Sequence, residues 1–187
     1  MAMFSNLDIN YLFHLTNKLL KIIILLFFLF LSFGLIQSLW ISPIDYIQGH
    51  SVRIMYVHVP SSWISLFCFA TIGFLSIFNF VFKSKNFQII CKSLAPIGLT
   101  FTVISIVTGS LWGQPTWGTW WAWDARITSM LILFILYVLY ILTFRIFEDQ
   151  DKSNKISSII AIFGAINIPI IKFSVDWWNT LHQPASI

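Results

Sequence analysis

The stretch LLKIIILLFFLFLSFGLIQSLW, residues 19–40, is a long apolar run with a single charged residue, Lys21. A helix that crosses a bilayer needs about 20 mostly apolar residues, and this stretch is long enough. Its apolar core, residues 22–36, is at the upper length limit for a secretory signal peptide, and no A-x-A cleavage pattern follows it. We therefore interpret it as a retained membrane anchor.

Four further stretches have the length and apolar character of membrane spans. They are residues 57–82, 94–111, 127–147 and 156–175, and the last is interrupted by Asn167, Pro169 and Lys172. Hydrophobic residues make up 58% of the chain and charged residues 10%, against about 45–50% and about 25% in soluble domains. The sequence predicts an all-α, polytopic membrane helix bundle with five transmembrane helices, forming a single integral-membrane domain over residues 1–187.

The distribution of Lys and Arg predicts how the bundle is oriented. Eight of these residues fall in the N-terminal flank and in the links after the second and fourth spans: Lys18, Lys21, Lys83, Lys85, Lys92, Arg145, Lys152 and Lys155. The other three, Arg53, Arg126 and Lys172, fall on the opposite side. Because cytoplasmic loops carry the excess of Lys and Arg, we expect residues 112–126 to face outward. This asymmetry accounts for the net charge of +4, so the charge does not indicate nucleic-acid binding.

The outward-facing segment WGQPTWGTWWAWDAR, residues 112–126, holds five of the nine tryptophans of the chain. Trp117, Trp120, Trp121 and Asp124 have the spacing i, i+3, i+4, i+7, which places them on one helix face if the segment is helical. Single boundary tryptophans commonly form the aromatic belt of a membrane protein. An acid on a face meant only for lipid would be costly, so this cluster favours a binding surface.

Two histidines reach the same membrane boundary from distant parts of the sequence. His58 lies in RIMYVHVPSSW, residues 53–63, and because Pro60 suits the first turn of a helix, we expect His58 just before the second span. His182 lies in DWWNTLHQP, residues 176–184, just after the fifth span. His14 and His50 are interpreted as ordinary exposed or satisfied polar residues.

Haem binding is the chemistry that would use this set of residues. Neutral imidazoles can ligate haem iron from both axial positions, and tryptophan rings can stack on a porphyrin. Arg53 and Arg126 are candidates to pair the two propionates, and Asp124 could orient an imidazole or an arginine. The sequence lacks paired carboxylates, a Ser/His/Asp set, a phosphate-binding loop, zinc-ligand spacing and CxxC motifs, and Cys68 and Cys91 are far apart. We therefore expect no enzyme activity.

The tryptophan segment resembles the signature of the haem-handling membrane proteins of cytochrome c biogenesis. RIMYVHVPSSW and NIPIIKFSVDWWNTLHQP, residues 167–184, resemble the histidine-bearing flanks of the CcmC type, and the resemblance runs from about residue 40 to the end. It implies that the protein holds haem b non-covalently at the outer face of the bacterial inner membrane or, alternatively, of the mitochondrial inner membrane. It also implies that haem is delivered to a membrane-tethered haem chaperone, in concert with ABC-type transporter subunits.

The resemblance assigns roles to ten residues. His58 and His182 match the axial ligands. The residues that match the haem- and chaperone-facing signature and its basic neighbours are Trp112, Trp117, Trp120, Trp121, Trp123, Asp124, Arg53 and Arg126. Family members usually have six spans, whereas five precede Ile187 here, so either the sixth span is absent or the sequence is incomplete.

Two alternative functions belong to other classes. A b-type cytochrome-like redox subunit would usually hold haem between histidines inside the spans, and no histidine is predicted at mid-span. A module that grips a lipid-linked sugar or a partner protein would need the tryptophans but not the histidines. A haem spectrum recorded with and without His58 and His182 distinguishes these possibilities.

Overall fold

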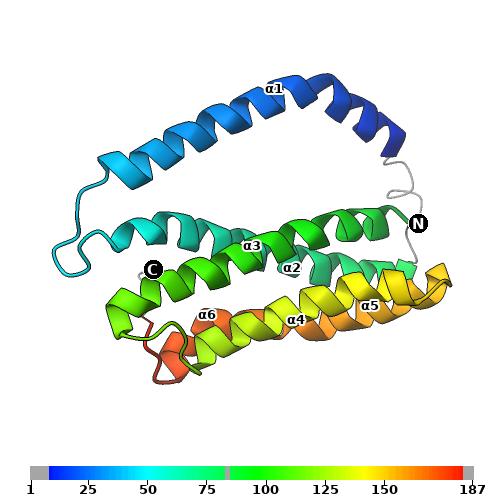
Figure 1. Ribbon diagram of the computed structural model, residues 1–187. Helices are drawn as coiled ribbons and strands as arrows, with labels where there is room; N and C mark the ends of the chain where they lie inside the picture. Colours follow the sequence, from blue (N-terminus) through cyan, green and yellow to red (C-terminus); the bar gives the residue numbers. More distant parts are fainter. Residues whose placement is uncertain (1–8, 83–84, 183–187) are drawn as a thin grey trace. The chain divides into compact units, whose positions relative to one another are not determined.

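The computed structural model describes residues 9–82 and 85–182, apart from the side chains of residues 9–15, 18 and 85. His14, Lys18, Lys83 and Lys85 therefore lie, wholly or by their side chains, outside the described part. The regular elements are α1 (Ile9–Ile36), the π-helical η1 (Gln37–Ile41), α2 (Val52–Phe82), α3 (Lys85–Trp117), α4 (Ala125–Ile146), α5 (Gln150–Ala165) and α6 (Asn167–Trp177) (Figure 1).

The predicted all-α class and the five spans are confirmed. Residues 19–41, 52–82, 86–117, 125–146 and 150–177 form helical segments long and apolar enough to cross a membrane. The fold is therefore that of a multi-pass membrane protein. The chain divides into two compact units, residues 1–47 and 48–187, and each is described separately. The assignment of the whole chain to one domain stays a prediction.

The first unit consists of α1 and η1. The described apolar side chains of α1 are exposed all around the helix, and none of its most apolar window is buried within the unit. A helix that is apolar on every side is suited to contact with lipid chains. The second unit contains all of the remaining helices.

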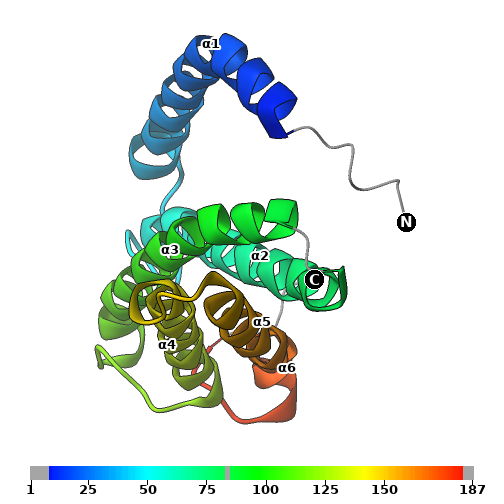
Figure 2. The same ribbon diagram turned by 90° about the vertical axis from the view of Figure 1, so that its right-hand side faces the viewer.

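In the second unit, α2, α3, α4 and the α5–α6 pair form a four-helix bundle. Figure 2 shows it from one end, and the neighbouring pairs are α2 with α3, α3 with α4, α4 with α5, and α5 with α2. The centre holds Phe69 and Tyr137, whose rings meet edge to face at 4.8 Å, and the Tyr137 hydroxyl donates to the Ser65 carbonyl at 2.7 Å. Ser65 in turn contacts Thr102 of α3 through its hydroxyl. Small hydroxyl side chains of this kind allow close helix packing in lipid while satisfying each other.

The fifth span is broken, as its polar residues indicated. Pro169 has no N–H to donate to the carbonyl four residues earlier, and its ring crowds that carbonyl. The helix is interrupted at Ile166, and the buried Asn167 amide donates to the Ser129 carbonyl of α4 at 2.8 Å. The break lets α6 pack against α4.

The second span begins earlier than the sequence predicted. We expected Pro60 in the first turn and His58 just outside the helix, but α2 begins at Val52 and contains both residues. Gly49, at φ +60°, turns the chain just before this helix. The helix accommodates Pro60 in its interior, where the residue leaves one backbone acceptor without its usual donor.

The tryptophan segment does not form one helix face, so that expectation is wrong. Helix α3 continues to Trp117, and residues 118–124 are irregular. Gly118 adopts φ +75°, and its N–H bonds to the Gln114 carbonyl, which is the geometry of a helix C-terminus. Asp124 then starts α4 as its N-cap, accepting from the Ile127 N–H at 2.8 Å. The segment is fixed by a helix end and a helix start.

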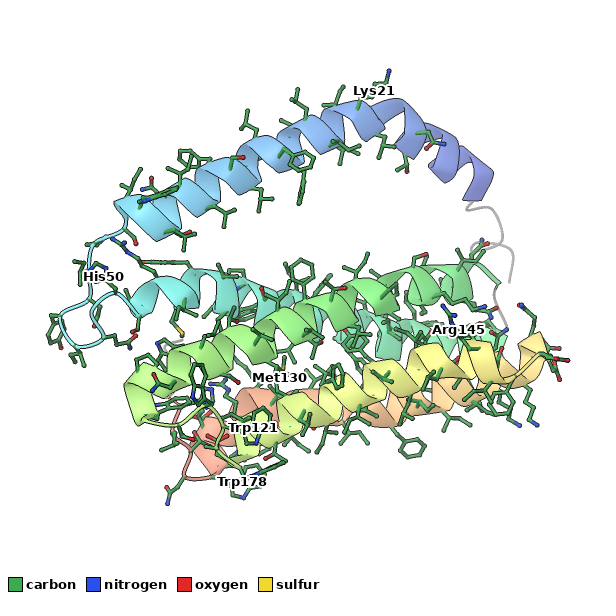
Figure 3. All side chains as sticks on the ribbon, in the orientation of Figure 1. Lys21, His50, Trp121, Met130, Arg145 and Trp178 are labelled. Carbon is green, nitrogen blue, oxygen red and sulfur yellow. The ribbon has the colours of Figure 1, made fainter. Side chains whose placement is uncertain are left out.

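The tryptophan end and the basic end of the bundle are opposite each other. Trp121 and Trp178 lie at one end and Arg145 at the other (Figure 3). Lys92, near the start of α3, and Lys152 and Lys155, near the start of α5, share the Arg145 end. The structure thus separates the charges as the sequence analysis required, and which end faces the cytoplasm stays a prediction.

Replacing Gly118 should destabilise the bundle through backbone strain. An added Cβ would meet no atom within 4 Å, so the cost of Gly118→Ala arises from φ alone, at about 1–2 kcal/mol. Gly118→Asn should cost less, because Asn tolerates left-handed backbone. Thermal unfolding of the purified protein in detergent measures this. Gly34→Ala in α1, also in open space, is the control and should not lower stability. Equal melting temperatures for Gly118→Ala and the parent would contradict the strain argument.

Candidate functional site

A cavity of about 370 Å³ opens at the tryptophan end of the bundle. Its size falls within the range of roughly 300–1,000 Å³ typical of small-molecule sites. Its wall is built from α2, α3, α4, α6 and the segment between α3 and α4. Seven of the ten residues that the sequence singled out line it: His58, Trp112, Trp117, Trp120, Trp121, Arg126 and His182.

Residues of α3 position the imidazole of His58, which belongs to α2. Its Nδ1 lies 2.9 Å from the Ser105 carbonyl oxygen and 3.2 Å from the Thr108 hydroxyl. A carbonyl only accepts, so Nδ1 carries the hydrogen, and in the neutral imidazole the lone pair is on Nε2. Gly109 lies against the ring, and a Cβ there would come within 2.9 Å of His58 Cε1. The imidazole is therefore positioned by one hydrogen bond and by one close backbone approach.

His182 has the same arrangement with a different partner. Its Nδ1 lies 3.4 Å from Asp124 Oδ2, and its side chain is 14% exposed. The pKa of His182 is lowered from its ordinary 6.5 to about 4: burial is the main cause, the Asp124 carboxylate opposes it, and Arg126 adds to it. The imidazole is thus neutral at pH 7. With Nδ1–H directed to a carboxylate, the lone pair again lies on Nε2.

Asp124 connects the start of α4 with the irregular segment after α6. One carboxylate oxygen caps α4, and the other accepts from the Leu181 N–H at 3.2 Å and faces His182. The irregular segment after α6 is therefore attached to the start of α4. From the sequence we expected Asp124 to orient an imidazole or an arginine. The structure places its carboxylate beside His182 through tertiary contacts, and the orienting role stays a prediction.

The tryptophans fall into two groups. Trp112 is buried, donates from Nε1 to the Gln48 side-chain oxygen at 3.1 Å, and packs edge to face with Trp117 at 4.8 Å. Trp117 in turn contacts the His182 ring edge to face at 4.7 Å. By contrast, Trp120 and Trp123 are 59% and 76% exposed. Trp112 and Trp117 thus pack beside His182, whereas Trp120 and Trp123 are exposed.

The remaining predicted residues include Trp121 and two arginines, Arg53 and Arg126. The Trp121 indole nitrogen is buried at the cavity wall without a hydrogen-bond partner. Arg126 lines the cavity, within electrostatic reach of Asp124 and Asp176. Arg53, Trp123 and Asp124 do not line it. The binding roles of all these residues stay predictions.

Trp63 and Lys172 are cavity residues that sequence reasoning did not single out. Lys172 of α6 places its ammonium group 5.1 Å from the centre of the Trp63 ring of α2, and both residues line the cavity. Their signal in the sequence is faint: Lys172 interrupts an apolar span, and Trp63 stands one helical turn after Val59, the residue that follows His58. The contact between Lys172 and Trp63 depends on the register of α6, which is set by the helix break at Ile166.

The titration of His182 tests this electrostatic environment. Its NMR chemical shifts should change with a midpoint near pH 4. The pKa of His182 is lower in the folded state than in the unfolded state, so protonation favours the unfolded form of this segment. The packing of His182 should therefore become less stable as the pH falls from 6.5 toward 4. Arg126→Gln should raise the midpoint, since Arg126 opposes protonation, whereas Lys155→Gln at the far end should not change it. A midpoint at 6.5 or above would show that the residue is solvated.

Comparison with known proteins shows the family to which this chain belongs. The family model described as heme exporter protein C matches residues 3–187. Heme exporter protein C of Bradyrhizobium diazoefficiens is 44% identical over 157 residues, which cover 84% of this chain and 59% of that protein. A ccmC-like mitochondrial protein of Marchantia polymorpha is 46% identical over 150 residues, 80% of this chain and 63% of that protein.

A third relative extends the match along this chain. Heme exporter protein C of Haemophilus influenzae is 41% identical over 175 residues, 94% of this chain and 71% of that protein. The chain thus spans about three fifths of the length of the first two relatives. The match to the family model covers almost every residue, including both histidines and the whole tryptophan segment. The chain belongs to the heme exporter protein C family.

Proposed function

We propose that this protein holds haem in the cavity at the tryptophan end of the bundle, with His58 and His182 as axial ligands, and hands it on for c-type cytochrome biogenesis. One observation carries the proposal. Two imidazoles line one cavity, and each directs Nδ1 to an oxygen acceptor, the Ser105 carbonyl or the Asp124 carboxylate. Both Nε2 atoms are then available as ligands.

The donor set suits a porphyrin iron better than a bare metal ion. In the described part of the chain, no three His, Cys, Asp or Glu side chains gather as metal ligands. A porphyrin supplies four nitrogens of its own, so its iron needs at most two protein ligands. Tryptophan rings at the cavity wall offer the large apolar contact that a flat macrocycle requires. The two cysteines do not line the cavity, in keeping with non-covalently held haem b.

The remaining parts of the proposal concern the setting. The relatives named as heme exporters favour a role as a transport or transfer component, rather than an enzyme, within the cytochrome c maturation system. We infer that the site faces outward from the bacterial inner membrane, or from its mitochondrial counterpart, to which the name of the Marchantia relative points. There it would load a membrane-tethered haem chaperone, and ABC-type transporter subunits would assist.

The ligand assignment predicts a spectrum. The purified protein loaded with haem should show low-spin, six-coordinate iron, because both axial positions are occupied by imidazole. His58→Ala or His182→Ala should weaken haem retention or convert the iron to high spin, and the double substitution should do both. Absorption spectroscopy of the oxidised and reduced protein measures this.

Two further variants define the ligation experiment. His50→Ala is the matched control, since His50 is exposed and does not line the cavity. Gly109→Ala should perturb the spectrum without removing a ligand, because its Cβ displaces the His58 ring. A low-spin spectrum that survives the loss of both histidines would disprove the assignment.

Delivery is predicted to depend on the exposed tryptophans. Trp123 is exposed, and its ring packs on Trp121, which lines the cavity, at 5.5 Å. Trp123→Ala should therefore slow haem transfer to the chaperone several-fold while the haem spectrum stays unchanged. Trp177→Ala serves as the control, because Trp177 is also exposed, at 58%, and lies outside the cavity wall. Loss of haem binding in Trp123→Ala, or unchanged transfer, would argue against a delivery surface.

A further inference from the structure

The cavity wall has an unbalanced positive charge. Among the described residues that line it are two permanent cations, Arg126 and Lys172, and no carboxylate. A concave site whose wall carries positive charge favours an anionic ligand.

The two cations are not equivalent. Asp124 and Asp176 both act electrostatically on Arg126, so the protein itself offsets much of that charge. Within residues 9–82 and 85–182, no Asp or Glu carboxylate lies within salt-bridge distance of Lys172, whose aromatic contact is with Trp63. Lys172 is therefore the cavity cation whose charge a ligand would neutralise.

The position of Lys172 strengthens this argument. It lies on α6 within the fifth spanning segment, where a charged side chain is costly and usually marks a ligand or ion path. The break at Ile166 directs α6 onto α4, and the residue before Lys172, Ile171, also lines the cavity. A methionine or leucine would satisfy the apolar surroundings at lower cost, so packing alone does not account for a lysine.

We propose that Lys172 recognises a carboxylate of the porphyrin and makes the cavity selective for porphyrins with free propionates. The inference rests on the proposed function and adds a specificity residue to the same site. The ammonium group would form a charge-assisted hydrogen bond with one propionate, taking the place that the sequence analysis gave to Arg53, which does not line the cavity. Arg126 remains available to the second propionate.

Iron protoporphyrin IX and its dimethyl ester are the probes that test this proposal. They have the same metal and the same ring, but the ester lacks both negative charges. The full chain in detergent is titrated with each, and binding is followed by absorbance. The parent protein should prefer the free acid, and Lys172→Met should weaken free-acid binding by roughly ten- to a hundredfold while leaving ester binding and the low-spin spectrum unchanged. Lys172→Arg should retain the preference.

Lys92→Met is the matched control. The Lys92 ammonium also lies over an aromatic ring, that of Phe144 at 4.1 Å, but Lys92 does not line this cavity. Its replacement should alter neither titration. Equal weakening of acid and ester in Lys172→Met would indicate a packing role, and unchanged binding of both would indicate no role; either result overturns the proposal while leaving haem binding in place. If the parent protein binds neither porphyrin, the proposed function itself is wrong.

Discussion

The arrangement of the site depends on the carboxylate of Asp124. One of its oxygens starts α4, and the other accepts from Leu181 and faces the His182 imidazole. A single side chain therefore determines where a spanning helix begins and where the segment after α6 is attached. Both functions exploit the same physics, since a carboxylate is a strong acceptor for the unpaired N–H groups of a helix start and of an irregular segment. Without it, the cavity would keep His58 but lose the anchor of the second imidazole.

The other imidazole is positioned by the packing of the bundle. His58 reaches the Ser105 carbonyl only because α2 and α3 approach closely, and small residues allow this approach: Gly109 leaves room for the ring, and the hydroxyls of Ser62 and Ser105 contact each other across the interface. In lipid, helices gain little from burying apolar surface against one another, so contacts between small and polar side chains determine their register. The register of α2 on α3 thus aligns a histidine with the carbonyl that sets its tautomer.

The sequence predicted the helices well and their ends poorly. Apolar length identified all five spans, because the bilayer imposes it on each span independently. Two local patterns gave wrong helix ends. Pro60 indicated a helix start near residue 60, but α2 begins at Val52. The spacing of Trp117 to Asp124 indicated one helix face, but α3 ends where Gly118 adopts φ +75°. His58 and His182 were identified from their shared boundary. Lys172 was not singled out as a cavity residue, because its place there follows from how α6 packs after the break at Ile166, which sequence periodicity does not encode.

The two proposed ligands are anchored unequally, and this asymmetry would suit the proposed hand-over of haem. His58 belongs to a long helix within the bundle, whereas His182 lies in an irregular segment tied to the bundle by a carboxylate and by the edge of Trp117. Local opening has a low free-energy cost where few buried contacts must break, so the His182 side should open before the His58 side. The exposed Trp120 and Trp123 lie in the neighbouring link between α3 and α4. In the proposed transfer, a partner that bound these rings would meet the haem at the ligand that is easier to displace, while His58 would hold the iron until the transfer was complete.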